Sequence, residues 1–470
     1  MTESGNTQEI FEQQLERQQD FTHRVREMLP GIYGNRPLAL VHTFGCQQNV
    51  ADSQRIKGML AEMGFGFTES VEQADLILYN TCAVREHAED RVFGNVGALV
   101  HRKREHPRCL VALCGCMMQQ PHIAEKIKKS YPYVDLVFGT HVIHMLPEFV
   151  YGRLSGGKRL FVAPESDGEI VEGLPEMRDS GIKGFLSIMY GCNNFCTYCI
   201  VPHVRGRERS RQPLDILADF KELVAAGIKD ITLLGQNVNS YGRGEDVDFP
   251  DLLDILNGVQ GDFRIRFMTS HPKDLTDKLI ETMARCEKVV RHIHLPVQAG
   301  NDDILRAMNR GYTSAEYIAL AGRLRAAMPD IAISSDIIVG FPGETHGQFA
   351  DTLRLVEQVR FSSLFMFIYS KREGTPAASL PDPVSHKEKT LWFRELQDTE
   401  EPVARALLSG LVGKRMRVLC EERGREPGVL VGRTEGNTVV EFAGDEALVG
   451  SFCEVEITES QNFQCKGKLV

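Results

Sequence analysis

Short apolar runs alternate with amphipathic stretches along most of this chain, beginning at about residue 36. Four runs between residues 36 and 151 are separated by helical patterns, the clearest around residues 53–63 and 86–104. Strands that alternate with helices favour a parallel sheet covered by helices. The sequence therefore predicts an N-terminal parallel α/β domain over residues 36–151. Its expected strands are 38–43, 76–79, 110–113 and 134–138.

A second α/β series occupies residues 183–400, where six apolar runs are again separated by helical patterns. A closed barrel of this type takes eight strand–helix units, so six units predict a partial (β/α)6 barrel. The expected strands are 185–190, 231–234, 264–268, 292–295, 332–339 and 363–368.

The other segments have different patterns. Residues 1–35 are polar and rich in Gln and Glu, which predicts an amphipathic helical extension without chemistry of its own. Residues 152–182 combine Gly, Pro and acidic residues without periodicity, as in a linker. From residue 401 to residue 470 short β-rich runs separated by turns predict a small all-β barrel or sandwich.

Charge and length narrow the classes of protein that fit these elements. The 470 residues include 54 Lys and Arg against 64 Asp and Glu, so the net charge is −10. This balance excludes a globally basic nucleic-acid binder but allows a local basic patch. No run of about 18 apolar residues occurs, which excludes a membrane-spanning helix. The first residues lack a basic segment followed by an apolar core, so a cytoplasmic location is expected.

Twelve cysteines in such a chain indicate metal binding or catalysis rather than disulfides. The densest group, Cys192, Cys196 and Cys199, has the spacing C-x3-C-x2-C just after the first strand of the expected barrel. Chemistry in parallel barrels lies at this end of the strands. Structural zinc takes four ligands, and only His203 lies nearby, whereas three thiolates on a [4Fe–4S] cluster leave one iron open. The spacing favours the cluster, with zinc and unliganded core cysteines as alternatives.

This motif resembles the signature of the radical S-adenosylmethionine (SAM) superfamily. The resemblance implies that the open iron binds SAM, whose reductive cleavage gives a 5′-deoxyadenosyl radical. Residues at the ends of the other expected strands fit a SAM site, although ordinary turn chemistry would explain each one alone. They are Gln236, Asn237, Ser270, Gln298, Val339 and Gly340.

Three further cysteines follow strands of the N-terminal domain. Cys46, Cys82 and Cys116 are 36 and 34 residues apart, about one strand–helix–strand unit each. Carboxyl ends of parallel strands share one edge, so these thiols are expected to hold a second [4Fe–4S] cluster; three buried structural cysteines are the alternative. Cys114 competes with Cys116, but Cys116 follows Gly115 as Cys46 follows Gly45. The remaining cysteines are expected in the core: Cys109, Cys286, Cys420, Cys453 and Cys465.

With both triplets in place, the chain resembles the MiaB-type methylthiotransferase family from about residue 36 to residue 470. Gln48 departs from the family, which often has Met there, and the C-terminal part resembles a TRAM domain, an RNA-binding β-barrel. The matching segments are TFGCQQN at 43–49, NTCAVRE at 80–86, GCM at 115–117, residues 191–211 ending in PHVRGRERSR, and REGTPAA at 372–378.

The resemblance implies a reaction in which a methylthio group replaces hydrogen at C2 of N6-isopentenyladenosine at tRNA position 37. It implies two [4Fe–4S] clusters, SAM, a reductant such as flavodoxin or ferredoxin, and a sulfur donor. One SAM would methylate a sulfur on the cluster at Cys46, Cys82 and Cys116, and another would supply the radical at the second triplet. Related branches modify threonylcarbamoyl-adenosine in tRNA or an aspartate of a ribosomal protein; the segments at 80–87 and 371–375 favour the isopentenyladenosine branch. An electron carrier is a further alternative.

RNA binding by this acidic chain requires local positive charge. Residues 411–470 contain 8 Lys and Arg and 10 Asp and Glu, a net charge of −2, so charge alone does not indicate RNA there. The alternating arginines after the central cysteines would line one side of an extended segment and contact phosphates. The expected RNA contacts are Arg205, Arg207, Arg209, Arg211, Lys414 and Arg415.

Overall fold

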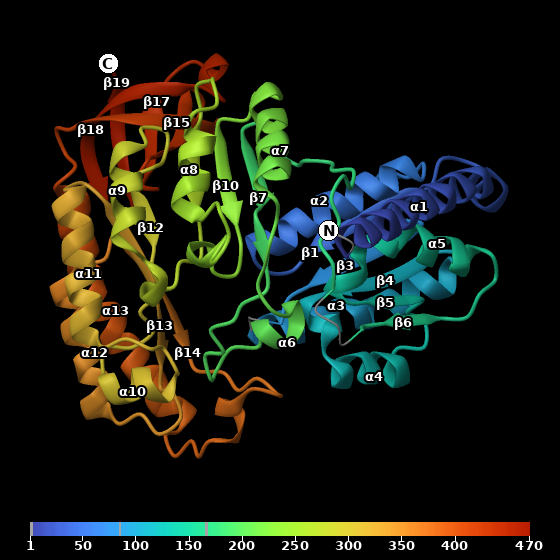
Figure 1. Cartoon of the computed structure of the whole chain (residues 1–470), viewed down its shortest axis with the longest axis horizontal. Helices are drawn as coiled ribbons and strands as arrows, with labels where there is room; N and C mark the ends of the chain where they lie inside the picture. Colours follow the sequence, from blue (N-terminus) through green and yellow to red (C-terminus); the bar gives the residue numbers. More distant parts are fainter. Residues whose placement is uncertain (1–2, 84–85, 165–167) are drawn as a thin grey trace. The chain divides into compact units, whose positions relative to one another are not determined.

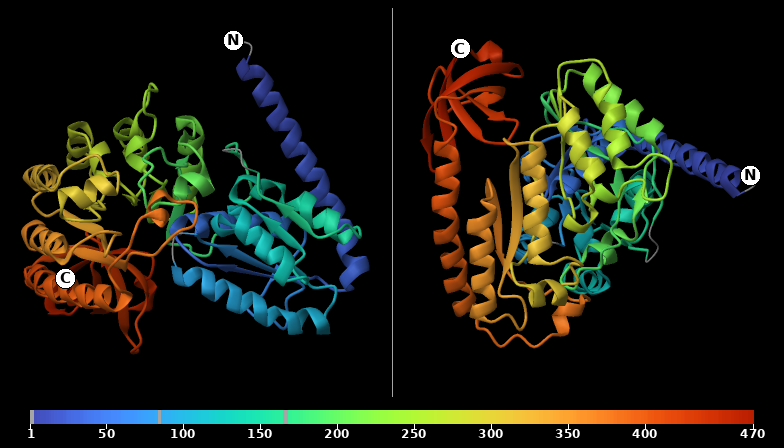
Figure 2. Two further views of the ribbon diagram at one scale, coloured as in Figure 1. Left: turned by 90° about the horizontal axis from the view of Figure 1, so that it is seen from below. Right: turned by 60° about the vertical axis from the view of Figure 1, so that its left-hand side comes forward.

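The computed structural model describes residues 3–83, 86–164 and 168–470 (Figure 1). Helices and strands alternate over most of the chain, whereas the C-terminal part is built from strands (Figure 2). Val84 and Arg85 of the NTCAVRE segment lie outside the described residues. No helix among the described residues is long and apolar enough to cross a membrane.

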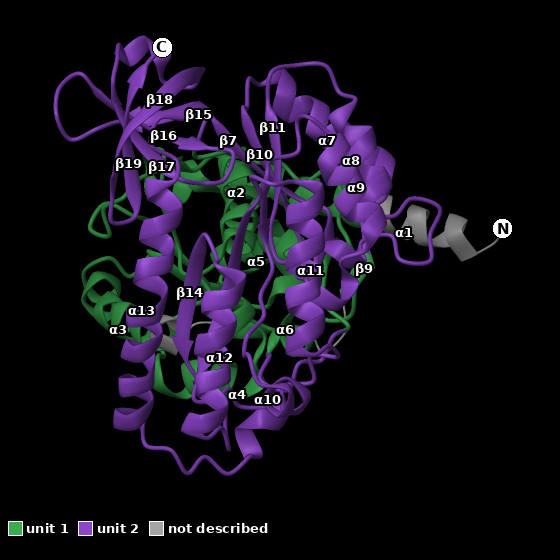
Figure 3. Ribbon diagram, turned by 90° about the vertical axis from the view of Figure 1, so that its left-hand side faces the viewer, with its two compact units in different colours: residues 1–179, 190–193, 200–209 green, residues 180–189, 194–199, 210–470 purple. Residues whose placement is uncertain are grey.

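The contacts divide the chain into two compact units (Figure 3). The first contains residues 1–179, 190–193 and 200–209, and the second contains residues 180–189, 194–199 and 210–470. The short strands β8 (Met189–Tyr190) and β9 (Arg209–Ser210) lie where the chain passes between units. The predicted boundaries at residues 151, 182 and 400 therefore remain sequence-based.

The first unit contains a six-stranded, all-parallel sheet in the order β2-β1-β3-β4-β5-β6. The four expected strands are present, which confirms the parallel α/β class. The short edge strands β2 and β6 were not predicted, because runs of two or three residues carry no periodicity; β6 lies in the expected linker. The strands are β1 (Leu38–Thr43), β2 (Gly66–Phe67), β3 (Leu76–Thr81), β4 (Leu110–Gly115), β5 (Leu136–Phe138) and β6 (Leu160–Val162).

Alternate residues of each strand point to opposite faces of this sheet and build two apolar clusters. Leu76 and Leu78 face one cluster, and Ile77 and Tyr79 face the other. The first cluster contains residues of α1 (Glu3–Tyr33), α2 (Gln47–Glu62) and α5 (Leu146–Leu154). The second contains residues of α3 (Glu86–Glu105) and α4 (Pro121–Ser130). The N-terminal segment is thus a helix, as predicted, and it buries Val25 and Leu29.

The second unit begins with six parallel strands arranged as a partial barrel. The sheets β11-β10-β7 and β12-β13-β14 are joined by a parallel bridge between Ile265 and Val289. This confirms the predicted (β/α)6 barrel. The strands are β7 (Lys183–Ser187), β10 (Asp230–Leu234), β11 (Arg264–Phe267), β12 (His292–His294), β13 (Ala332–Val339) and β14 (Ser363–Ile368).

Helices follow these strands, and several begin at residues suited to capping. Thr313 and Thr345 form capping boxes with Glu316 and Gln348, which satisfy the first backbone N–H groups. The larger helices of this unit are α7 (Pro213–Ala225), α8 (Phe249–Asn257), α9 (Asp277–Arg285), α11 (Ser314–Ala327), α12 (His346–Val359) and α13 (His386–Ser409). Smaller helices are α6 (Val201–Arg205) in the first unit and α10 (Asp302–Ala307) in the second.

The C-terminal part of the second unit is a closed five-stranded barrel in the order β15-β16-β17-β19-β18, with α13 leading into it. A barrel rather than a sandwich is therefore present. Strand β19 was not predicted, because the Gln-Cys-Lys-Gly-Lys sequence lacks an apolar alternation, yet it closes the barrel between β17 and β18. The strands are β15 (Arg415–Arg423), β16 (Val429–Thr434), β17 (Val439–Ala443), β18 (Phe452–Gln461) and β19 (Gln464–Leu469).

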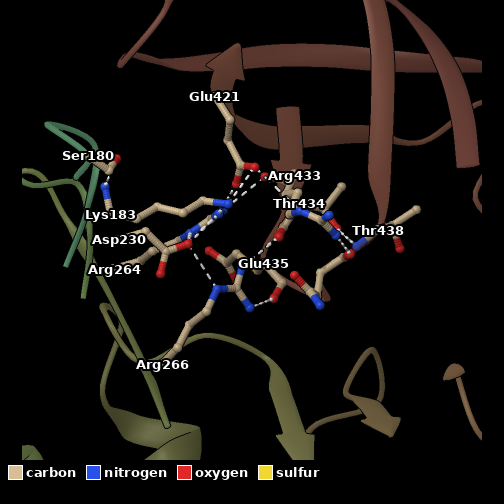
Figure 4. Close-up of polar contacts among 11 residues, drawn as sticks. Ser180, Lys183, Asp230, Arg264, Arg266, Glu421, Arg433, Thr434, Glu435 and Thr438 are labelled. Atoms are coloured by element: carbon tan, nitrogen blue, oxygen red, sulfur yellow. Dashed lines mark hydrogen bonds and ion pairs between the residues drawn. The ribbon is translucent and has the colours of Figure 1, made fainter. Parts of the chain in front are cut away.

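Charged residues at the amino ends of the strands β7, β10 and β11 bind this small barrel (Figure 4). Asp230 accepts hydrogen bonds from Nε of Arg264 at 2.6 Å and of Arg266 at 3.0 Å. Both guanidinium groups also donate to backbone carbonyls of residues 433–435, at 2.8 to 2.9 Å. We call Asp230, Arg264 and Arg266 the basal charge cluster. All three side chains are buried, so the cluster fixes the turn after β16 to the base of the larger barrel.

A β-bulge brings one more carboxylate to this contact. The register of β15 against β16 shifts between Cys420 and Glu422, and a bulge of this kind redirects the side chain at the extra residue. Glu421 there lies 2.6 Å from Nζ of Lys183 and 3.4 Å from Nε of Arg433. The small barrel is thus held at the amino end of the strands, opposite the end where ligands bind in this fold.

Candidate metal centres

The first candidate centre lies at the carboxyl edge of the sheet in the first unit. Cys46 is the N-cap of α2 after β1, Cys82 follows β3, and Cys116 begins a 3-10 turn after β4. Neighbouring parallel strands end side by side, so the three cysteines reach the same edge. The glycine before Cys46 contributes to this approach: Gly45 has φ +137°, and a Cβ there would lie 2.5 Å from Cβ of Cys82.

Buried amides connect the loops that carry these cysteines. Asn49 donates to Oδ1 of Asn80 and to the carbonyl of Thr81, both at 3.0 Å. Asn80 donates back to the carbonyl of Asn49 at 2.8 Å and to Oγ of Ser53 at 3.0 Å. Sγ of Cys46 lies 3.3 Å from Oδ1 of Asn49. Asn49 and Asn80 both belong to segments that matched the family, and the structure assigns them this supporting role.

Cys116 is buried and lies against a guanidinium group. Nε of Arg205 donates to Sγ of Cys116 at 3.1 Å, and Arg205 also donates to Oδ2 of Asp52 at 2.6 Å. Burial, with a smaller contribution from Cys82 and Cys46, raises the pKa of the Cys116 thiol to about 12, although the charge of Arg205 opposes the shift.

Cys114 has different surroundings from Cys116. It lies inside β4 and packs in the apolar cluster with Ala112 and Leu136, on one face of the sheet. Cys116 packs instead with Ala83, Ile200 and Val204. The structure therefore places Cys114 in the apolar core of the sheet and Cys116 at its edge.

The second candidate centre comes from the central motif. In the first unit, the backbone N–H of Cys192 donates to the carbonyl of Gly206 at 3.1 Å. In the second unit, Cys196 and Cys199 share a turn closed by a hydrogen bond of 2.9 Å between Cys199 N–H and the Cys196 carbonyl. Thr197 within this turn donates to the carbonyl of Met308 at 3.1 Å.

Arg310 contacts the Cys196–Cys199 turn. Its guanidinium donates to Sγ of Cys196 at 3.3 Å and to the carbonyl of Pro296 at 2.7 Å, and its Nε donates to the Tyr312 hydroxyl at 2.9 Å. Arg310 is only 4% exposed. No sequence motif marked this residue, because its partners lie up to 114 residues away.

The expected SAM-binding residues lie at or just beyond the carboxyl ends of strands in the second unit. Asn237 is already engaged, since it donates to Oδ2 of Asp274 at 2.7 Å and accepts from His271 N–H at 3.0 Å. Oγ of Ser270 is buried and has no hydrogen-bond partner within the described part of the chain. Gln298 has φ +75° and bridges to Ile337 of β13.

A buried carboxyl group shapes the last of these strand ends. Glu344 accepts from the N–H groups of Gly340 at 2.8 Å and Phe341 at 3.1 Å. Burial raises the pKa of Glu344 to about 7, although these two bonds oppose the shift. Gly340, which follows Val339, has φ +72°, so the strand turns sharply here. The hydrogen bonds to Glu344 thus hold the loop after β13 in its conformation. The sequence alone had not indicated this role for Glu344.

Two of the four arginines expected to face phosphates are buried. Arg205 and Arg211 are 5% and 2% exposed; Arg211 donates to the carbonyl of Ser187 at 2.8 Å and to Asp219 at 2.7 Å. Arg209 is partly buried and donates to the carbonyls of Gly168 and Arg205. Arg205 ends α6, whereas Arg209 lies in the short strand β9, so the arginines do not share one continuous extended segment. The side chains of Arg207, Lys414 and Arg415 are exposed.

The donor set proposed for each centre is three cysteines, which suits an iron–sulfur cluster. Each thiolate of a cubane cluster binds a different iron, so three thiolates leave one iron open. Two triplets of cysteines, each with one sulfur beside a buried guanidinium, suit an anionic cluster.

Comparisons with known proteins agree with this reading of the three parts. Residues 186–356 match the radical SAM superfamily, residues 39–139 match the uncharacterized protein family UPF0004, and residues 411–470 match the TRAM domain. The chain is therefore a radical SAM enzyme, a class that uses a [4Fe–4S] cluster and SAM. A radical SAM methyltransferase from Kitasatospora setae, TsrM, shares the fold with a TM-score of 0.55 at 14% identity, over 73% of this chain and 75% of that one.

Full-length relatives define the family more narrowly. A tRNA-2-methylthio-N(6)-dimethylallyladenosine synthase of Thermoanaerobacter sp. (strain X514) is 47% identical over 466 residues, 98% of each chain. The enzyme of the same name from Clostridioides difficile (strain 630) is 45% identical over 95% of each chain. The chain belongs to the family of tRNA-2-methylthio-N(6)-dimethylallyladenosine synthases, which are methylthiotransferases.

Proposed function

We propose that this enzyme adds a methylthio group to C2 of N6-isopentenyladenosine at position 37 of tRNA. The observation that carries the proposal is the 47% identity to a synthase of this name over 98% of both chains. Three cysteines that follow the neighbouring strands β1, β3 and β4 of the first unit support it, because methylthiolation needs a second sulfur-bearing centre in addition to the radical one.

We assign one [4Fe–4S] cluster to each cysteine triplet. Cys192, Cys196 and Cys199 would hold the cluster that binds SAM, and Cys46, Cys82 and Cys116 the auxiliary cluster. When bound, the two groups supply the radical and the sulfur chemistry. The chain itself orients the ligands: the Asn49–Asn80 pair fixes the loops of the auxiliary triplet, and Arg310 supports the turn of Cys196.

For SAM, we assign the backbone and side chains at the strand ends of the second unit. Ser270 offers a buried hydroxyl, and Gln236, Gln298, Val339 and Gly340 lie on the same rim. Asn237 is assigned a positioning role instead, because its amide holds Asp274 and the His271 backbone.

The tRNA, a reductant such as flavodoxin or ferredoxin, and a sulfur donor are the proposed partners, in the cytoplasm. The TRAM barrel and the exposed side chains of Arg207, Lys414 and Arg415 are the proposed RNA contacts. The target base would leave its stack to reach the radical, as other base-modifying enzymes require.

Iron content and nucleoside analysis test these assignments. Anaerobic reconstitution should give about eight irons per chain, and joint replacement of Cys192, Cys196 and Cys199 by Ala about half of that. The reconstituted enzyme should convert N6-isopentenyladenosine in tRNA to its methylthio form and leave threonylcarbamoyl-adenosine unchanged, as mass spectrometry of digested tRNA would show. Stoichiometric zinc without iron, or modification of threonylcarbamoyl-adenosine alone, would contradict the proposal.

A further inference from the structure

Each cysteine triplet contains one sulfur that accepts a hydrogen bond from a buried arginine. Arg205 donates to Cys116 at 3.1 Å, and Arg310 donates to Cys196 at 3.3 Å. These arginines lie on different segments, in different units, and neither is in the cysteine motifs. The same contact at both triplets calls for a common explanation.

The carboxylate of Asp52 holds the side chain of Arg205 in place. Its side chain and that of Asp52 are 6% and 5% exposed, with 2.6 Å between NH2 and Oδ2. Asp52 lies on α2, one turn beyond Asn49, on the helix that begins at Cys46. The carboxylate balances the charge of the guanidinium, so the pair has no net charge beside Cys116.

Arg310 is bonded to neutral groups besides the cysteine. Its partners are the carbonyl of Pro296 and the hydroxyl groups of Tyr312 and Tyr198, at 2.7, 2.9 and 3.5 Å. Hydroxyl and carbonyl groups do not cancel its charge. The net positive charge beside Cys196 is therefore larger than that beside Cys116.

We propose that Arg205 and Arg310 are positioning residues that raise the reduction potentials of the two clusters, each acting through the thiolate that it contacts. Reduction adds negative charge to a cluster, and hydrogen bonds to its sulfurs together with nearby positive charge stabilise the reduced form. This inference rests on the cluster assignment of the proposed function. It explains why a guanidinium is buried at each triplet, where a neutral side chain would cost less to desolvate.

The test is a redox titration followed by electron paramagnetic resonance on the anaerobically reconstituted full-length enzyme. Arg310→Gln should shift the SAM cluster to a more negative potential and leave the auxiliary cluster unchanged. Arg205→Gln should shift the auxiliary cluster to a more negative potential and leave the SAM cluster unchanged. Each arginine is thus the control for the other. Arg310→Lys and Arg205→Lys retain the charge and should shift the potentials less than the Gln variants.

A third arginine gives a matched control. Arg102 is 8% exposed, donates to the carbonyl of Ala74 at 2.8 Å and lies beside Cys109, a cysteine outside both triplets. Arg102→Gln should leave both potentials unchanged. Iron analysis of the unmutated enzyme comes first, because fewer than about eight irons would contradict the cluster assignment itself. With eight irons present, unchanged potentials in the Arg205 and Arg310 variants, or equal shifts in the Arg102 variant, would overturn the inference.

Discussion

Replacing Cys116 by alanine should abolish methylthiolation of tRNA while SAM cleavage to 5′-deoxyadenosine continues. The variant removes one of three proposed ligands of the auxiliary cluster and leaves Arg205 buried without its sulfur acceptor. None of the side chains assigned to the radical centre is changed. The two products can be measured in one reaction by mass spectrometry, with reconstituted enzyme, SAM, reductant and tRNA carrying N6-isopentenyladenosine.

Cys114→Ala is the control two residues away. Cys114 lies in the apolar core of the sheet, so its loss should lower the free energy of unfolding by about 1 kcal/mol and spare methylthiolation. If Cys114→Ala abolished methylthiolation and Cys116→Ala did not, the ligand assignment would be wrong. Cys196→Ala should differ from Cys116→Ala by losing both products, because it removes a proposed ligand of the radical cluster.

Replacing Asp230 by alanine should lower the free energy of unfolding of the full chain by roughly 3–5 kcal/mol, because two guanidinium groups would stay buried without their carboxylate. Asp230, Arg264 and Arg266 are 3%, 2% and 7% exposed, so solvent screens little of this cost. Chemical denaturation followed by circular dichroism measures the loss. A change below about 1 kcal/mol, as for an exposed ion pair, would contradict it.

The basal charge cluster also predicts a pH dependence. Burial alone would raise the pKa of Asp230, but Arg266 and Arg264 hold this pKa below its ordinary value. Its stabilising contribution is therefore complete above the unfolded-state pKa of about 3.9 and is lost as the pH falls through the lower folded-state pKa. The exposed pair Arg405–Glu401, 62% and 56% exposed, is the control: Glu401→Gln should change the free energy of unfolding by only about 0.5 kcal/mol.

Most of the fold could be predicted because the buried strands carry strong apolar runs. Leu76, Ile77, Leu78 and Tyr79 alternate between two apolar clusters, so the entire run must be hydrophobic. Strand β19 lacks this signal, since its place depends on pairing with β17 and β18 rather than on its own composition. Pairing partners distant in sequence leave no local pattern.

The candidate site was predicted only in part, for a similar reason. Cysteine spacing indicated both triplets, because thiol ligands are rare and their positions after strands repeat. The role of Arg205 was missed because arginines usually lie at the surface, and its partner Asp52 is 153 residues earlier in the chain. The one available signal was Asp52 itself, an acidic residue on the same side of its helix as Asn49.

The basal charge cluster has a consequence for the order of events during synthesis. Arg264 and the carbonyl of Arg433 that accepts its hydrogen bond are 169 residues apart. At about 5–20 residues per second, a ribosome would need roughly 10–30 s to cover this distance. During that interval the base of the larger barrel would present two arginines and one aspartate to water, without the turn that later covers them. A nascent chain halted between residues 264 and 433 would therefore contain a larger barrel whose basal charge cluster is exposed to water. Faster hydrogen exchange of the backbone amides at Asp230 and its neighbours would detect this exposure.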